Sequence, residues 1–256
     1  MKRSNLILSP LLLCAILGNT VKGNEVEQSL DQFNRLRFAI GGAIELVKSD
    51  KNRVNLEVIR GDSANLRIEV KDKTLWIGRE TPNNWRFWRN WAPLAVHGTI
   101  YYEDQLNHLI ASGSGRISTK DLKQPSLALE INGSGDIRIT SMVLGEIEST
   151  IRGSGDIRID EGELGIVRSY ILGSGTIVIQ DSSAAESHLI IKGSGDFQAE
   201  SLMTSTTDIQ ILGSGDAAVY ASDSLGISIK GSGNVNYWGE AKVSEDVAGS
   251  GDIMAH

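Results

Sequence analysis

An acidic side chain follows the tripeptide Gly-Ser-Gly at regular intervals in the second half of the chain. Asp136, Asp156, Asp196 and Asp216 each occupy this position. Two carboxylates about 5 Å apart repel each other by roughly 1 kcal/mol in water. A row of them is therefore hydrated, neutralised or loaded with a metal ion. Calcium fits such a row because it prefers several oxygen ligands.

Two interpretations of this Asp row stay open. A calcium row would use the four carboxylates together with serine hydroxyls and backbone carbonyls. However, the sequence lacks the denser Gly-Gly-x-Gly-x-Asp pattern of calcium-binding β-rolls. Arg152, Lys192 and Lys230 also precede three of the tripeptides and could neutralise nearby carboxylates. We therefore expect a structural use of these aspartates in turns, and of the tripeptide serines in a hydrogen-bonded ladder.

Residues 79–93 form the most aromatic and basic stretch, with three of the five tryptophans. Tryptophan and arginine dominate the energetic centres of interfaces, and aromatic rings stack on sugars and guanidinium groups. The simpler expectation is a loop folded over the flank or the open end of the fold. The alternative is a ligand or partner contact made by Trp85, Arg86, Trp88, Arg89 and Trp91.

The remaining residues that could do chemistry form no recognisable catalytic set. The four histidines are far apart in the sequence and lack motif-like partners. No nucleophile elbow, Walker loop or dinucleotide fingerprint occurs in the strand-to-helix context that it needs. We expect the histidines to have isolated structural or surface roles.

The first 23 residues have the three regions of a secretory signal peptide. Lys2-Arg3 precedes an apolar run from Leu6 to Leu17, and small residues follow. The run is too short to span a bilayer, and nothing later predicts a transmembrane helix. Cys14, the only cysteine, lies in this run. Lipid attachment at Cys14 is the alternative, but Leu13 stands where a lipobox has a small residue.

The expected cleavage also decides the charge of the mature chain. It removes three of the 25 basic residues and none of the 32 acidic ones, which leaves a net charge near −10. Such a surface repels phosphate backbones, so we exclude nucleic acid as a partner. Without Cys14 the mature chain has no thiol, which excludes disulfides, thiolate metal sites and cysteine nucleophiles.

The tripeptides belong to an internal repeat that organises most of the chain. Gly-Ser-Gly begins at residues 113, 133, 153, 173, 193, 213, 231 and 249, at intervals of 20 and then 18 residues. Around each tripeptide every second residue is apolar or small, as in Leu127, Leu129 and Ile131. Period two predicts strands with one buried face.

The glycines fall at inward positions of this alternation, which predicts a corner between two short strands. An extended chain can turn sharply toward its own core only where no Cβ intrudes. Segments such as residues 140–146 would bring the chain round to the next rung. The predicted corner glycines are Gly133, Gly135, Gly153, Gly155, Gly173, Gly175, Gly193, Gly195, Gly213 and Gly215.

A unit of about twenty residues cannot bury its apolar face alone, whereas stacked units create a continuous core. We therefore predict an all-β fold, a single-stranded parallel β-helix over residues 113–256, with right-handed turns as the default. Residues 24–112 also show the alternation of strands, but they lack the tripeptide corner. We expect them to form irregular first rungs or a cap. An antiparallel sandwich is the competing fold, and it gives no reason for the fixed interval.

The order of these elements resembles a known bacterial family. N-terminal strands carry Gly61-Asp62 and Thr74-Leu75, and tandem Gly-Ser-Gly-Asp-Ile units follow. This arrangement is similar to the head GIN domain family of auto-transporter adhesins, over residues 30–256. The resemblance implies export and a β-solenoid, and it implies no catalytic residues.

We therefore predict an exported, non-catalytic binding or scaffold protein of the bacterial envelope, periplasmic or at the cell surface. Its partner would be an envelope protein or a glycan, and no cofactor is expected apart from the calcium alternative. A polysaccharide-active enzyme is the second hypothesis, because some β-helices cleave glycans with carboxylates along a groove. The third is a homo-oligomer formed through the C-terminal strand edge, since residues 249–256 lie inside a rung motif.

Overall fold

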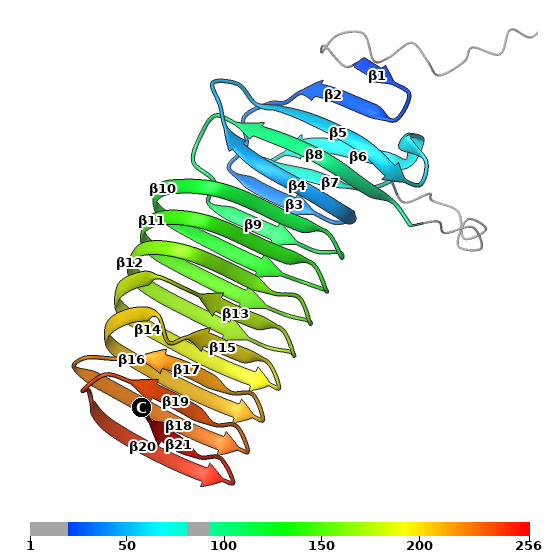
Figure 1. The fold of residues 1–256 in the computed structure, drawn as a ribbon. Coiled ribbons are helices and arrows are strands. Elements are labelled where there is room, and N and C mark those ends of the chain that lie inside the picture. Colours follow the sequence, from blue (N-terminus) through cyan, green and yellow to red (C-terminus); the bar gives the residue numbers. More distant parts are fainter. Residues whose placement is uncertain (1–19, 81–92) are drawn as a thin grey trace, which may run out of the picture.

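The computed structural model describes residues 20–80 and 93–256. In this part the chain forms a straight stack of parallel rungs below an N-terminal β region (Figure 1). The predicted β-solenoid is confirmed, with rungs of about twenty residues. The apolar run of the predicted signal peptide lies outside the described residues.

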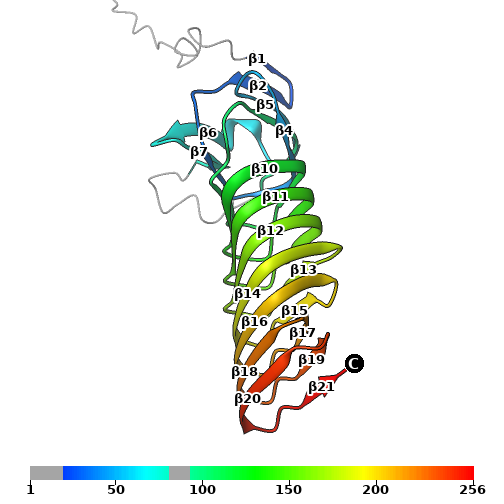
Figure 2. The same ribbon diagram turned by 90° about the vertical axis from the view of Figure 1, so that its left-hand side faces the viewer.

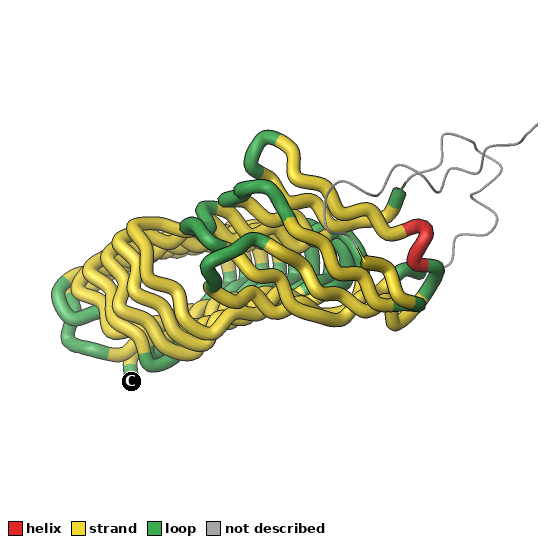
Figure 3. Tube along the Cα trace, turned by 90° about the horizontal axis from the view of Figure 1, so that it is seen from above, coloured by secondary structure: helices red, strands yellow, loops and turns green. Residues whose placement is uncertain are grey.

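Each rung leaves a Gly-Ser-Gly corner along one side of the solenoid and returns to the next corner along the other. Strands in equivalent places pair in parallel with those of the next rung, and the shift is 20 residues in the first rungs. Viewed along the axis, the rungs form a flattened section with two long sides (Figure 3). The rung strands are β9 (His108–Ala111), β10 (Arg116–Ile131), β11 (Asp136–Ile151), β12 (Ile157–Ile171), β13 (Thr176–Ile179), β14 (Ser182–Gly193), β15 (Asp196–Ala199), β16 (Leu202–Gly213), β17 (Ala217–Tyr220), β18 (Ser224–Gly231), β19 (Val235–Trp238), β20 (Lys242–Gly249) and β21 (Ile253–Ala255).

The strands of the first complete rungs are longer than the sequence predicted. β10 and β11 each run for 16 residues, from just after one corner to just before the next. Residues 140–146, expected as a connection, are therefore part of a strand. The 18-residue rungs are two residues shorter on the side opposite the corners. There the link from Tyr220 to Ser224 is shorter than the equivalent link one rung earlier, from Glu200 to Thr206. Both long sides thus keep their register.

The N-terminal region contains both first rungs and a cap. β3 pairs in parallel with β7 and β9, and β4 with β8 and β10, so β3–β4 is a rung that lacks the tripeptide. β5, β2 and β1 add antiparallel strands beyond β8, and β6–β7 is a hairpin that projects sideways (Figure 2). The elements are β1 (Thr20–Lys22), β2 (Glu25–Ser29), β3 (Arg35–Phe38), β4 (Gly41–Lys48), β5 (Arg53–Arg60), a 3₁₀ turn (Ser63–Asn65), β6 (Leu66–Lys71), β7 (Thr74–Arg79) and β8 (Ala95–Tyr102).

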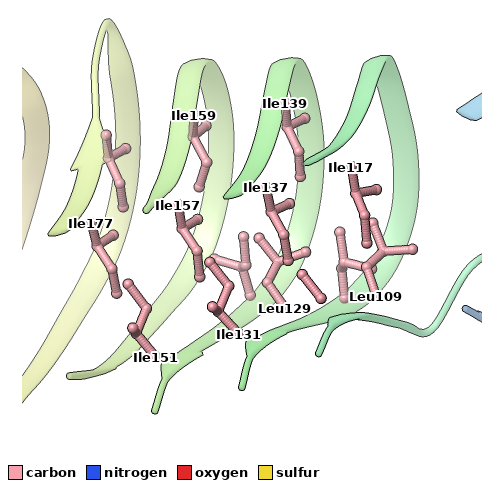
Figure 4. Close-up of a cluster of buried hydrophobic side chains, with 14 of the residues drawn as sticks. Leu109, Ile117, Leu129, Ile131, Ile137, Ile139, Ile151, Ile157, Ile159 and Ile177 are labelled. Atoms are coloured by element: carbon pink, nitrogen blue, oxygen red, sulfur yellow. The ribbon is translucent and has the colours of Figure 1, made fainter. Parts of the chain in front are cut away.

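The core is a set of apolar columns inside the stack. Ile117, Ile137, Ile157 and Ile177 are paired rung by rung and fully buried. Figure 4 shows this column beside a second one that includes Ile131 and Ile151. Because the same side chain repeats through these four rungs, each of their layers packs on a layer of the same shape, which favours one register.

The corner glycines are needed for a further reason besides the predicted turn. A Cβ on Gly193 would lie 2.3 Å from the carbonyl oxygen of Gly173, and one on Gly195 would lie 2.3 Å from that of Gly175. Gly193 also has a φ of +147°, which L side chains rarely adopt. The obstacle is therefore the backbone of the neighbouring rung, and the close stacking of corners excludes side chains.

Candidate functional site: the corner edge and the outward faces

The serines at the corners form an exposed line along one edge of the solenoid. The central serine of every tripeptide from Ser134 to Ser250 is exposed, whereas the glycine after it is buried in all but the last tripeptide. Each serine N–H donates to the first glycine of the preceding corner, for example Ser154 to the Gly133 carbonyl at 2.9 Å. The corners are thus stacked in register, and their hydroxyls face outward.

The Asp row runs beside the serines and links one rung to the next. The Asp156 carboxylate accepts a hydrogen bond from the Thr176 N–H at 3.0 Å, and Asp196 accepts one from the Asp216 N–H at 3.1 Å. Asp216 accepts from the backbone N–H and the side-chain amide of Asn234 at 2.7 and 3.0 Å. These contacts give the aspartates a structural use that needs no metal ion.

Arg152 does not neutralise an aspartate of the Asp row, although the sequence suggested that it could. Its guanidinium lies 2.7 Å from the carboxylate of Glu130, on the other side of the corner. Asp136 is paired instead with Arg116, at 3.0 Å, in the equivalent position of the preceding rung. Within residues 20–80 and 93–256, no three His, Cys, Asp or Glu side chains are grouped as a metal site would require.

A second charged cluster lies on the neighbouring outward face. Asp160 contacts Arg138 at 2.9 Å and Arg158 at 2.7 Å. Burial raises the pKa of the Asp160 carboxyl, but the hydrogen bonds and charges of the two arginines outweigh it and hold this pKa below its usual value. The cluster is an inter-rung ion-pair network in which two arginines share one carboxylate.

The five candidate contact residues Trp85, Arg86, Trp88, Arg89 and Trp91 lie outside the described residues. The strands on either side of this segment are described. β7 and β8 pair in parallel with β3 and β4 at the N-terminal end of the stack. Leu94 is fixed there by its carbonyl, which accepts a hydrogen bond from Gly41 N–H at 3.1 Å.

The histidines of the described rungs lie at separate places, as the sequence predicted. His108 contacts Glu130 at 3.1 Å, and His256 is stacked on Trp238 with ring centroids 4.6 Å apart. His188 lies between Glu186 and Asp208, at 3.4 and 3.5 Å.

A shallow groove, which sequence reasoning missed, surrounds His188. It is a hollow of about 420 Å³ on the outer face of β14, β16, β18 and β20. Its walls are outward side chains of successive rungs, including His188, Asp208 and Gln210. The repeat itself could have indicated this groove. Once the length of each rung is known, residues 188, 208, 226 and 244 align in one column.

These features define a repeat protein of the β-solenoid class, whose candidate contact surfaces are columns of side chains on its edge and faces. The chain belongs to the family described as "Putative auto-transporter adhesin, head GIN domain", whose model matches residues 32–241. This confirms the resemblance seen in the repeat. No curated protein matches the sequence significantly.

Solved structures of bacterial proteins share the fold. A "putative lipid binding protein" from Parabacteroides distasonis has a TM-score of 0.81 and 22% identity, over 91% of this chain and 97% of that one. A "putative adhesin" from Parabacteroides merdae has a TM-score of 0.80 and 20% identity, over 90% and 94% of the two chains. A further "putative adhesin" from P. distasonis has a TM-score of 0.75 and 20% identity, over 91% and 96%.

Between residues 20 and 80, and from residue 93 onward, no helix has the length and apolar character needed to cross a bilayer.

Proposed function

We propose that the protein is an exported, non-catalytic binding protein of the bacterial envelope, which attaches to an envelope protein or a glycan as an adhesin does. The observation that carries this proposal is the corner edge, where exposed serines continue from rung to rung and outward aspartates lie beside most of them. Such an edge offers a repeated contact rather than a single pocket. Membership of the adhesin family supports it.

The Trp-rich segment of residues 79–93 is the proposed centre of this contact. The described strands that flank it, β7 and β8, pair with β3 and β4 at the N-terminal end of the stack. Tryptophan and arginine together supply large apolar contacts and charge in one short segment.

The experiment compares the wild type with the triple variant Trp85→Ala, Trp88→Ala, Trp91→Ala. Binding to isolated bacterial envelopes and to a glycan array is measured for both. We expect at least tenfold weaker capture by the variant, with an unchanged far-UV circular dichroism spectrum. A second variant, Ser134→Ala, Ser154→Ala, Ser174→Ala on the corner edge, measures how much the serines contribute to capture. Unaltered capture by the tryptophan variant would remove the segment from the contact.

The enzyme alternative is tested separately with the same purified protein. Release of reducing ends or unsaturated products from a panel of envelope and plant glycans would replace the adhesin proposal by a polysaccharide-active one. The described carboxylates of the corner edge already accept hydrogen bonds from neighbouring rungs, which favours the binding role.

Self-association through the C-terminal edge is the second candidate. Within the described residues no strand pairs with the outer edge of β20, where Val243 and Val247 are 38% and 41% exposed. Glu245 opposes this association, because it continues the inward column of Ile227 and a further strand would bury its charge. We therefore expect a monomer at micromolar concentration, as light scattering would show.

A further inference from the structure

We propose that the groove on the outer face of β14, β16, β18 and β20 binds an uncharged glycan chain that lies along the solenoid axis. This inference deepens the proposed function, because it names a ligand class and a site for envelope binding. It uses none of the residues of the Trp-rich segment or of the corner edge.

The walls of the groove are two columns of outward side chains. One column contains His188 and Asp208, and the other contains Gln210, Ser228 and Asp246. Between the columns Leu189, Ile209 and Ile227 point into the core and are buried, so the floor is backbone. The hollow of about 420 Å³ is within the range of small-ligand sites.

Gly226 opens one wall of the groove. It occupies the column of His188 and Asp208 but carries no side chain. A Cβ at this position would lie 2.6 Å from the Asp208 Oδ1 atom. The carboxylate of Asp208 therefore lies over the glycine, and the space beyond it stays accessible from the groove.

The groove begins one rung after a pair of large charged side chains. In the preceding rung the counterpart of His188 is Arg168, whose guanidinium forms an ion pair with Glu146. Further along the column the side chains become smaller, from His188 to Gly226 and Ser244.

The polar groups of the groove suit hydroxyl groups better than anions. Carboxylates accept hydrogen bonds, amides and imidazoles can donate them, and serine hydroxyls do both. Sugar hydroxyls also donate and accept, so each can pair with two of these groups. Asp208 and Asp246 repel phosphates and uronates, and His188 is the only basic residue among the described lining residues. Ile190 adds an apolar surface for the C–H face of a sugar ring.

The direction of the columns favours a linear chain over a peptide strand. The backbone of the floor is already paired in the parallel ladders of β14, β16, β18 and β20, so a peptide cannot add main-chain hydrogen bonds there. Equivalent side chains repeat along the axis about every 4.8 Å. A pyranose unit of a linear glycan has a similar length, so successive units would meet successive rungs.

Isothermal titration calorimetry with the full chain tests this proposal. The probes are neutral tetra- to hexasaccharides of glucose, mannose and N-acetylglucosamine, with oligogalacturonate as the anionic comparison. We expect at least one neutral probe to bind, and oligogalacturonate to bind at least tenfold more weakly. Gly226→Gln, which fills the groove, and Asp208→Ala should each weaken binding about tenfold or more.

The control variant is Ser224→Ala, on the same strand as Gly226 but outside the groove, and it should bind as the wild type does. Thermal melting of each variant verifies that the fold is kept. Binding of no neutral probe, equal binding of the anionic probe, or unchanged binding by both groove variants would overturn the proposal. Because envelope capture is measured independently, intact capture together with no groove binding refutes the groove alone, whereas absent capture refutes the proposed function.

Discussion

Replacing one corner glycine by alanine tests the packing that aligns the outward columns. Gly193→Ala places a methyl group 2.3 Å from the carbonyl oxygen of Gly173, which belongs to the backbone of the neighbouring rung and cannot rotate away. It also forces alanine to adopt a φ of +147°. Gly173→Ala introduces a similar clash, at 2.2 Å from the Gly153 carbonyl oxygen, without the φ penalty.

The two effects can be estimated separately. Overpacking in a tight site costs about 1–3 kcal/mol. A φ near +147° lies in an extended region essentially confined to glycine, which costs an L residue about 1–3 kcal/mol more. We therefore expect losses in the free energy of unfolding of about 1–3 kcal/mol for Gly173→Ala and about 2–6 kcal/mol for Gly193→Ala. Ser194→Ala, at the exposed position next to Gly193, should change it by less than about 0.5 kcal/mol.

Urea unfolding followed by circular dichroism measures these differences. Because each rung contacts only its neighbours, the rungs on either side of the substitution can separate in stability, and a second transition is expected for Gly193→Ala. A Gly193→Ala protein as stable as the Ser194→Ala control would refute the reasoning, since close backbone stacking at the corners would then be absent.

Further predictions concern single side chains and the effect of calcium. Asp216→Ala should lower the free energy of unfolding by about 1 kcal/mol, because it removes a hydrogen bond between rungs. The melting temperature of the wild type should be the same with calcium or with chelator. The Asp160 carboxyl has a lowered pKa, so its contribution to the free energy of unfolding is complete above about pH 4 and is lost as the pH falls through that lowered value. Unfolding of Asp160→Asn measured as a function of pH should lack this loss. Ser149→Ala and Ser169→Ala should leave stability unchanged or raise it by up to about 1 kcal/mol in urea unfolding, because both hydroxyls are buried without a hydrogen-bond partner in the described protein. Glu245→Val should raise the mass measured by light scattering, because it removes the charge that blocks the edge of β20.

The repeat made the solenoid predictable from the sequence. The fixed interval of the tripeptide and the period-two alternation together determine which residues face the core, as the buried column from Ile117 to Ile177 confirms. The corner positions were also predictable, and the positive φ of Gly193 agrees with the predicted turn, but the contact between corners was not predicted. The obstacle to a side chain comes from the adjacent rung, and a single unit read alone contains no information about its neighbour.

The N-terminal region could be predicted only in part. Its alternating strands were visible, but their pairing was not, because β3–β4 lies between β7–β8 and β9–β10 although both pairs follow it in the sequence. No local pattern encodes this order. The groove was missed for a related reason: the gap at Gly226 becomes a feature only beside Asp208 of the adjacent strand.

The alignment of successive corners can be measured directly by disulfide formation. In a Cys14→Ala background, Ser154→Cys and Ser174→Cys lie in adjacent rungs about 4.8 Å apart, within the Cα separation of about 4.4–6.8 Å that a disulfide allows. Ser154→Cys with Ser194→Cys spans two rungs, about 9.6 Å, which is too far. Mass spectrometry after mild oxidation should find an intramolecular disulfide in the first pair and free thiols in the second. Free thiols in the first pair, or a disulfide in both, would contradict the stacked columns on which the binding surfaces depend.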